Sequence, residues 1–289
     1  MAFYENDSLM MSISHFQDFM TRILPEGEEP VVIFSSVWPL LKMLPDDPQR
    51  NLNKILNVLL SLCLPKRSLL MPSFPRGYNQ QGVCNLDHDP STTGILSEAF
   101  RLYPGVRRSV SAFFPYCILG PHQEEVVALK PMDAWGDGSL YEWMENKNAL
   151  FLMLGSHPTH CSYLHRMEWL AKDFLSYRYE RKKMGKVIWE GQEMHLEENL
   201  YVRSLNPPVV NDFTVLQPCL IQGGMKLDFF ENIPVATMYA QDMKKVFERI
   251  LRQDPLVVVK NRSDYEIRID QKKIVSDDSR SHTSERFSD

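Results

Sequence analysis

A run of six apolar residues, from Ala149 to Leu154, ends at Gly155 and leads directly into a segment with helical periodicity. A short apolar run that ends at a glycine is typical of a buried strand. In the next segment, Ser156 to Phe174, apolar side chains recur every three or four residues, which predicts a helix with one buried face. These apolar positions are Tyr163, Met167, Leu170, Ala171 and Phe174. A strand followed by a helix is the unit of an α/β sheet, and ligands bind where such strands end.

The opposite face of this predicted helix carries His165, Glu168 and Lys172. Side chains three or four residues apart on a helix are neighbours, so the imidazole and the Glu168 carboxylate can share one site. Histidine side chains have an ordinary pKa of about 6.5, which suits them to exchange protons near neutral pH. The other interpretation is a solvated helix face on which Glu168 pairs with Lys172.

Strand patterns alternate with helix patterns along the rest of the chain. Strands are predicted at 30–34, 68–71, 107–120, 149–154 and 256–259, and helices at 12–24, 35–44, 51–64, 95–102, 140–146, 156–174 and 238–252. This alternation implies a three-layer α/β/α fold with a mainly parallel central sheet. Ser35 and Ser36 follow the first strand and are expected to cap the next helix, where free backbone N–H groups suit a phosphate or an oxyanion.

The pattern changes after Ser176, where apolar and polar residues alternate on both sides of Lys183-Met184-Gly185-Lys186. The change predicts an antiparallel excursion from the sheet, with a hairpin turn at 183–186. The second half of this excursion carries four acidic residues, Glu190, Glu193, Glu197 and Glu198. They form either a site that attracts a cationic amine or a solvated acidic edge.

Residues 1–260 are predicted to form a single domain, followed by a disordered polar tail over 261–289. Apolar residues make up 44% of the chain and charged residues 24%, which is ordinary for a globular protein. The last segment, Ser276 to Asp289, is rich in Ser, Asp and Arg, a composition that buries too little apolar surface to fold. The five cysteines are widely spread without a CxxC pair, so neither a disulfide framework nor a metal site is expected.

The net charge of −5 argues against nucleic-acid binding, which depends on basic patches, and is compatible with a cationic substrate. The first residues are acidic and polar, unlike a signal peptide. The apolar segment 51–64 is interrupted by polar residues and is too short to span a bilayer. We therefore expect a cytoplasmic protein, a monomer or a homodimer, with neither a nucleic-acid nor a membrane partner.

A series of motifs resembles the aminoglycoside 3-N-acetyltransferases, also called antibiotic N-acetyltransferases. The segment 87–109 contains Pro-Ser-x-x-Gly, then Glu-x-Phe-Arg, then Pro-Gly-x-x-Arg-Ser, in the order and at the spacing of this family. Other segments resemble the family in the same order: Val31-Val32-Ile33-Phe34-Ser35-Ser36, Leu70-Met71-Pro72-Ser73-Phe74, Gly136-Asp137-Gly138-Ser139, Leu152-Met153-Leu154-Gly155 and Ser162-Tyr163-Leu164-His165-Arg166-Met167-Glu168. The resemblance covers about residues 28–260, and several ordered motifs are more specific than one.

The resemblance implies an enzyme that moves an acetyl group from acetyl-CoA directly to a primary amine of an aminoglycoside or amino sugar. Its fold would be unrelated to that of the more common acetyltransferases, and no metal is expected. His165 would be the general base, and Glu168 would orient it or hold the ammonium group of the substrate. The CoA-binding residues would be Ser35, Ser36, Arg108 and Ser109, and the acceptor-binding residues Asp87 and Ser73.

One segment departs from the family pattern. Where the family continues Arg-Ser-x-His-Pro-x-x-Ser, this chain reads Arg108-Ser109-Val110-Ser111-Ala112-Phe113-Phe114-Pro115, so a histidine and a serine are missing. Gly120 keeps the register of the family. Two other functions stay open: a binding or scaffold protein that keeps the fold without turnover, and an acyltransferase that uses another acyl-CoA or a carrier-protein thioester.

Overall fold

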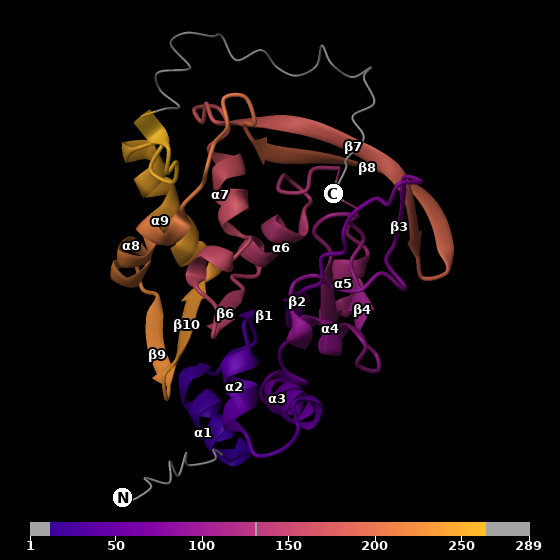
Figure 1. Cartoon of the computed structure of the whole chain (residues 1–289), viewed down its shortest axis with the longest axis vertical. Coiled ribbons are helices and arrows are strands. Elements are labelled where there is room, and N and C mark those ends of the chain that lie inside the picture. The colour runs from indigo at the N-terminus through magenta and orange to yellow at the C-terminus, as the bar shows by residue number, and fades with distance from the viewer. Residues whose placement is uncertain (1–11, 131, 264–289) are drawn as a thin grey trace, which may run out of the picture.

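The computed structural model describes residues 12–130 and 132–263. Their main sheet has seven strands in the order β4-β5-β2-β1-β6-β10-β9 (Figure 1). These strands are β1 (Val31–Ser35), β2 (Leu69–Pro72), β4 (Arg107–Arg108), β5 (Tyr116–Leu119), β6 (Leu150–Leu154), β9 (Lys226–Phe230) and β10 (Ile233–Tyr239). Within this sheet, parallel pairing is confined to β2-β1-β6, and antiparallel strands flank this centre. The predicted α/β class is confirmed.

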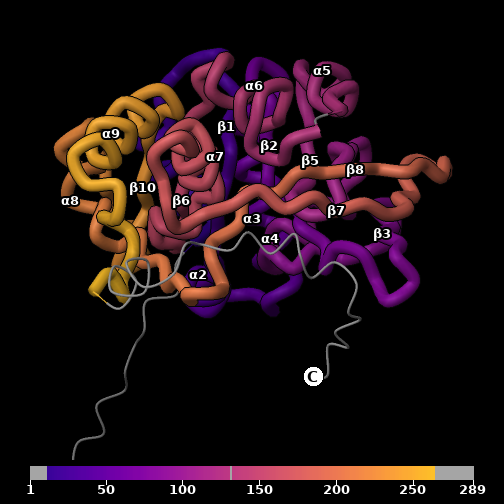
Figure 2. Tube along the Cα trace, turned by 90° about the horizontal axis from the view of Figure 1, so that it is seen from above, coloured from indigo at the N-terminus to yellow at the C-terminus, as the bar shows by residue number. Residues whose placement is uncertain are grey.

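Helices cover both faces of this sheet, as Figure 2 shows from above. They are α1 (Ile13–Ile23), α2 (Trp38–Met43), α3 (Pro48–Cys63), α4 (Ile95–Arg101), α5 (Gln123–Val127), α6 (Leu140–Asn146), α7 (Leu164–Leu170), α8 (Gln217–Gln222) and α9 (Ala240–Gln253). Val32 and Phe34 of β1 share a core with α6, α7 and α9, whereas Val31 and Ile33 share the opposite core with α1 to α4. Successive strand residues point to opposite faces, so one apolar strand builds both cores.

The order of the strands creates a place for a ligand. β2 and β6 lie on opposite sides of β1, and the three parallel strands end at the same edge of the sheet. Ser35, Pro72 and Leu154 are the last residues of these strands. In an open α/β sheet the crevice beyond such a switch in strand order is where ligands bind.

A second sheet of three strands contains the predicted antiparallel excursion. β7 (Arg178–Trp189) and β8 (Gln192–Arg203) form a long curved hairpin whose far end reaches β3 (Val83–Asn85) (Figure 1). The turn predicted at 183–186 is wrong, because the chain turns at Glu190 and Gly191, which have φ values of +49° and +71°. Gly185 lies inside β7, where a Cβ would be 2.6 Å from the ring of Tyr78. This glycine permits a close approach and does not mark a turn.

The helix predicted at 156–174 is wrong at both ends. The His157 side chain accepts the N–H of Thr159 and starts a short 3-10 turn, η1 (Pro158–His160), and α7 begins only at Leu164. Phe174 lies beyond the end of α7 and is exposed, although the periodicity predicts it to be buried. The observed helix α7 is therefore short, but it still contains both His165 and Glu168.

The sequence predicts that Ser35 and Ser36 cap a helix, and this prediction is wrong. Ser35 is the last residue of β1, and the N–H of Ser36 donates to the carbonyl of Leu154 at 2.9 Å. α2 begins at Trp38, without a side-chain cap. The sheet ladder thus continues past the strand and uses the N–H that a cap would leave free.

The C-terminal part of the described chain contains turns. The strand predicted at 256–259 is wrong, since these residues form turns with one bridge between Asn211 and Val259. Most of the tail predicted at 261–289 lies outside the described residues. The single domain over 1–260 stays a prediction.

Gly155, directly after β6, packs against the backbone of Ser36 at this edge of the sheet. Its φ is +62°, and a Cβ would lie 2.5 Å from the Ser36 carbonyl oxygen. We expect Gly155→Ala to lower the free energy of unfolding, measured in urea, by more than the roughly 1–2 kcal/mol that the left-handed conformation costs. Gly138→Ala is the matched control, because Gly138 has a φ of +74° and open space at its Cβ. Equal losses would contradict the clash.

Candidate functional site

His165 and Glu168 are in contact on α7. The Nδ1 atom of His165 lies 2.7 Å from Oε2 of Glu168. The Glu168 side chain is 0% exposed and the His165 side chain 31% exposed, so the carboxylate lies behind the ring. Lys172 pairs with Glu180 at 3.3 Å, not with Glu168. The alternative interpretation, a solvated Glu168–Lys172 pair, is therefore wrong.

Four side chains hold the Glu168 carboxylate. Besides His165, Tyr177 donates its hydroxyl at 2.8 Å, Arg178 Nη2 lies 2.6 Å away, and Asn211 donates its amide at 3.3 Å. Burial by itself raises the pKa of this carboxyl group. The charge of Arg178 and the hydrogen bonds from His165 and Tyr177 outweigh burial, so the pKa of Glu168 lies below its ordinary value. Glu168 is ionised at neutral pH.

An ionised Glu168 decides which nitrogen of His165 carries the proton. An unprotonated Nδ1 would turn its lone pair toward a carboxylate oxygen 2.7 Å away, which is repulsive. We therefore assign the proton to Nδ1, which donates to Glu168. Arg178 Nη2, 3.1 Å from the same nitrogen, then donates to Glu168 and not to His165. Nε2 keeps a lone pair that can accept a proton.

The His165 ring lies in the wall of a cavity of about 450 Å³, which we call the His165 cavity. Trp135 and Phe213 meet the ring edge-on, with centroids 5.2 and 5.5 Å away. These contacts hold the plane of the ring. The other lining residues are Phe114, Arg178, Tyr179, Arg181, Leu200, Tyr201, Val202, Arg203, Leu205 and Asn211.

A second cavity, of about 210 Å³, lies where β1, β2 and β6 end, and we call it the strand-end cavity. It is lined by Phe34, Ser35, Pro72, Phe74, Thr93, Ser156, His160 and Ser162. Phe74 of this cavity and Phe114 of the His165 cavity contact each other edge-to-face, with centroids 5.4 Å apart. This aromatic pair stands between the two cavities.

Of the four residues predicted to bind CoA, Ser35 alone lines the strand-end cavity. The guanidinium of Arg108 is buried and donates to the backbone carbonyls of three loop residues. The hydroxyl of Ser109 accepts the N–H of Tyr116 at 2.9 Å. Arg108 and Ser109 thus hold backbone segments together, and their role in CoA binding, like that of Ser36, stays a prediction.

The structure does not bring the two predicted acceptor residues together with His165. The carboxylate of Asp87 accepts the N–H groups of Glu190 and Gly191 at 2.7 and 2.9 Å. These contacts place Asp87 at the hairpin turn, whereas His165 lies beside the opposite end of β7. Ser73 is fully buried and lines neither cavity.

The four glutamates of the hairpin do not form one acidic site. Three of them pair with cations, in the pairs Glu190–Arg107, Glu193–Lys186 and Glu197–Lys182. The fourth, Glu198, is buried. None of the four lines the His165 cavity. They are therefore not a receptor for a cationic amine beside His165.

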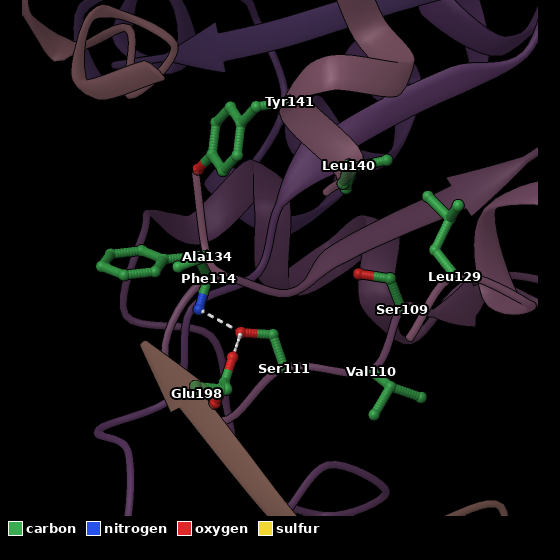
Figure 3. Close-up of a pocket in the computed structure, with 9 residues that line it drawn as sticks. All are labelled: Ser109, Val110, Ser111, Phe114, Leu129, Ala134, Leu140, Tyr141 and Glu198. Carbon is green, nitrogen blue, oxygen red and sulfur yellow. Dashed lines mark hydrogen bonds between the residues drawn. The ribbon is translucent and has the colours of Figure 1, made fainter. Parts of the chain in front are cut away.

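Ser111 stands where the family has the missing histidine, and its hydroxyl donates to Glu198 at 2.5 Å (Figure 3). The N–H of Ala112 donates to the other oxygen of Glu198 at 2.8 Å. Burial raises the pKa of Glu198, and these two hydrogen bonds offset only part of that effect. Ser111 also accepts the N–H of Phe114 at 2.9 Å. The pair therefore ties β8 to the loop that places Phe114 between the cavities.

The sequence reasoning missed Tyr177, Arg178 and Asn211, which surround Glu168. Tyr177 and Arg178 start an alternating strand pattern, in which an arginine is an ordinary surface residue. Asn211 is 43 residues away from Glu168 along the chain. No local spacing signals such a contact, and the one available signal was the carboxylate of Glu168, which needs a cation if it is buried.

The fold and the site together define a mixed α/β protein with an oriented histidine–glutamate pair beside a cavity at the sheet edge. The sequence model of the family aminoglycoside 3-N-acetyltransferase matches residues 52–252. The chain belongs to this family, as its motifs predicted. No curated protein matches it by sequence.

Solved structures of low sequence identity share the fold. AAC-IIIb in a binary complex with CoASH is 15% identical, with a TM-score of 0.71 over 84% of this chain and 97% of that chain. AAC-VIa bound to sisomicin is 17% identical, with a TM-score of 0.68 over 83% and 97%. The YokD protein from Bacillus subtilis is 15% identical, with a TM-score of 0.67 over 83% and 99%.

Among residues 12–130 and 132–263, no group of three or more His, Cys, Asp or Glu side chains could hold a metal ion. No helix in the same residues is both long and apolar enough to cross a membrane.

Glu168→Gln should destabilise the protein in a pH-dependent way. The change leaves the buried Arg178 without its anion, which typically costs about 3–5 kcal/mol. Because the folded-state pKa lies below the ordinary 4.5, the stability from Glu168 is present above about pH 4.5 and is lost as the pH falls through the folded pKa. We expect the difference in Tm from the wild type to be full near neutral pH and to shrink in acid. Glu180→Gln, at an exposed pair, is the control and should cost less than about 1 kcal/mol. A difference that is constant with pH would contradict the assignment.

Ser111→Ala should also cost more near neutral pH than in acid, although the pKa of Glu198 is raised and not lowered. The folded-state pKa of Glu198 is raised, so stability falls as the pH rises through it. The Ser111 hydroxyl favours the ionised carboxylate, and removing it typically costs about 1–3 kcal/mol. We expect the loss of unfolding free energy, measured in urea, to grow as the pH rises from acid to neutral. A loss that is larger in acid would show that Glu198 is not the group involved.

Proposed function

We propose that this chain transfers an acetyl group from acetyl-CoA to a primary amine, with His165 as the general base. The observation that carries the proposal is the 2.7 Å contact between His165 Nδ1 and the buried, ionised Glu168, with the ring in a cavity wall. This contact holds the ring and leaves Nε2 to accept a proton. Membership of the aminoglycoside 3-N-acetyltransferase family supports the reaction class.

In the proposed reaction the amine nitrogen attacks the thioester carbon of acetyl-CoA. A C–N bond forms, the C–S bond breaks, and CoA leaves as a thiolate. His165 Nε2 takes the proton that the amine loses, and this proton or one from water then converts the thiolate to the thiol. The carboxylate of Glu168 beside Nδ1 stabilises the imidazolium that forms on His165. General base catalysis of this kind typically contributes about 10²–10⁴-fold.

The strand-end cavity is our proposed position for the thioester of the donor. It lies beyond the ends of the three parallel strands, where α/β sheets bind ligands. The hydroxyl of Ser35, which lines it, can donate to a carbonyl oxygen, whereas the hydroxyls of Ser156 and Ser162 contact His160 and Tyr116. The N–H of Ser36 already donates to a backbone carbonyl, so we assign it no such role. AAC-IIIb, which has the same fold, was solved with CoASH.

The amine and the thioester must meet for the transfer to occur. The edge-to-face rings of Phe74 and Phe114 stand between the two cavities. We therefore place the meeting point at this pair, where rotation of one ring would join the His165 cavity to the strand-end cavity.

The acceptor belongs to the primary amines in this proposal. The sequence predicts an aminoglycoside or amino sugar, and AAC-VIa, which has the same fold, was solved with sisomicin. The histidine and serine missing from this chain alter the segment that carries Phe114, a wall of the His165 cavity. We therefore keep the aminoglycoside as one candidate within the wider class.

Thiol release from acetyl-CoA with a panel of primary amines tests the proposal. We expect turnover by the wild type, a loss of about 10²-fold or more in kcat for His165→Ala, and an equal rise in Tm of both proteins with acetyl-CoA. His195→Ala is the matched control, because His195 is an exposed histidine of β8, and it should keep the full rate.

Other results of this experiment would support the alternative functions, a binding protein or an acyltransferase with another donor. Turnover that survives in His165→Ala would overturn the general base. A chain that is stabilised by acetyl-CoA but acetylates no amine would be a binding protein of the same fold. Thiol release from only a longer acyl-CoA or a carrier-protein thioester would replace acetyl-CoA as the donor.

A further inference from the structure

Three arginines of the hairpin, Arg178, Arg181 and Arg203, line the His165 cavity. Arg178 is neutralised by Glu168. Arg203 lies opposite Arg178 in the β7–β8 ladder and donates to the backbone carbonyl of Val209. Both Arg181 and Arg203 are exposed, and neither has a carboxylate partner among the described residues. Arg181 lies opposite Leu200, so Arg181 and Arg203 are not directly opposed on the ladder, and each presents a positive charge that a bound anion would neutralise.

No aspartate or glutamate of the described chain lines the same cavity. Glu168 lies behind His165, and its oxygens are engaged by four side chains. The hairpin glutamates are paired with cations or buried against Ser111. Lys183 adds a further cation on β7, and its pKa is lowered by burial and then by the charge of Arg181. Two guanidinium charges thus face the cavity without anions.

We propose that the acceptor in the His165 cavity is an amine that also carries a carboxylate or phosphate group, bound by Arg181 and Arg203, and is not a polycation. The inference rests on the proposed function, because it identifies the acceptor of the reaction at His165. Guanidinium groups bind carboxylates and phosphates through paired, charge-assisted hydrogen bonds. A polycationic aminoglycoside would meet like charges in this cavity and no carboxylate.

The rest of the wall defines the body of the acceptor. Trp135, Phe213 and Tyr179 supply aromatic surface, and Leu200 and Val202 supply aliphatic surface. Cavities of this kind bind an apolar body and orient it by a few polar groups. An amine at His165 and an acid at the arginines would place an aromatic or other apolar body along this wall.

Paired amines test the charge preference. kcat/KM is measured by thiol release for 4-(aminomethyl)benzoate against benzylamine, for tyramine phosphate against tyramine, and for sisomicin. We expect an acid-bearing amine to exceed its uncharged partner by about tenfold or more. Arg181→Gln and Arg203→Gln should remove this preference by raising KM for the acceptor. Arg249→Gln, at an exposed position of α9 outside the cavity, is the matched control and should keep it.

The arginines could bind the phosphates of CoA instead of an acid group on the acceptor. KM for acetyl-CoA and KM for the acceptor distinguish the two cases. The proposal requires KM for acetyl-CoA to stay unchanged in Arg181→Gln and Arg203→Gln. A raised KM for acetyl-CoA with an unchanged KM for the acceptor would overturn it and assign the arginines to the donor.

Charge reversal gives a second, opposite readout. In the double variant Arg181→Glu/Arg203→Glu we expect KM for sisomicin to fall by about tenfold or more and the preference for acid-bearing amines to be lost. The proposal is overturned if the wild type acetylates sisomicin better than every acid-bearing amine and the reversal changes nothing.

Binding distinguishes failure of this inference from failure of the transferase. If no amine is acetylated, but 4-(aminomethyl)benzoate raises Tm of the wild type and not of Arg181→Gln/Arg203→Gln, the anion site stands and the transferase fails. If sisomicin is acetylated and no acid-bearing amine is bound or acetylated, the anion site fails and the transferase stands. If no amine is bound or acetylated, both fail.

Discussion

The fully buried carboxylate of Glu168 is the interaction on which the site depends. A carboxylate without water costs several kcal/mol unless charge and hydrogen bonds replace the water. Here the replacements come from different segments: His165 from α7, Tyr177 and Arg178 from the start of the hairpin, and Asn211 from the loop after it. The contacts that keep the carboxylate charged therefore also hold the start of the hairpin against α7. One buried charge orients the His165 ring and positions a wall of its cavity.

Local patterns predicted the parts of this structure that local interactions decide. Periodicity predicted the central strands β1, β2 and β6 and most of the helices but missed β9 and β10. The contact of His165 with Glu168 follows from helical spacing. The hairpin turn was misplaced because a glycine in an alternating pattern reads as a turn signal. Gly185 is instead needed because the ring of Tyr78, from a distant segment, packs closely against it. The partners of Glu168 were missed for the same reason, since the strand pattern around Arg178 does not reveal what lies behind it.

Some motif residues that identify the family make structural contacts and line neither the His165 cavity nor the strand-end cavity. The Arg-Ser pair at 108 and 109 belongs to a motif that predicts CoA binding, yet Arg108 is buried and donates to three backbone carbonyls, which gives it a structural reason to be an arginine. Next to it, Ser111 replaces the family's histidine and binds the buried Glu198. The Ser111 hydroxyl also accepts the N–H of Phe114, so this contact holds the loop that carries Phe114. The motif marks the fold, and it does not by itself say which side chains touch a ligand.

The proposed general base and the proposed acceptor-binding arginines lie on separate elements. His165 is on α7 and is held by Glu168, whereas Arg181 and Arg203 are strand residues whose replacement leaves the backbone ladder intact. A few substitutions on the hairpin can therefore change which acceptor charge the cavity prefers without moving His165. Fold alone does not determine the substrate. The net charge of −5 is a weaker guide to the acceptor, because surface carboxylates are screened beyond about 10 Å. The two arginines line the cavity itself, so their charge would act at contact distance on an acceptor bound there.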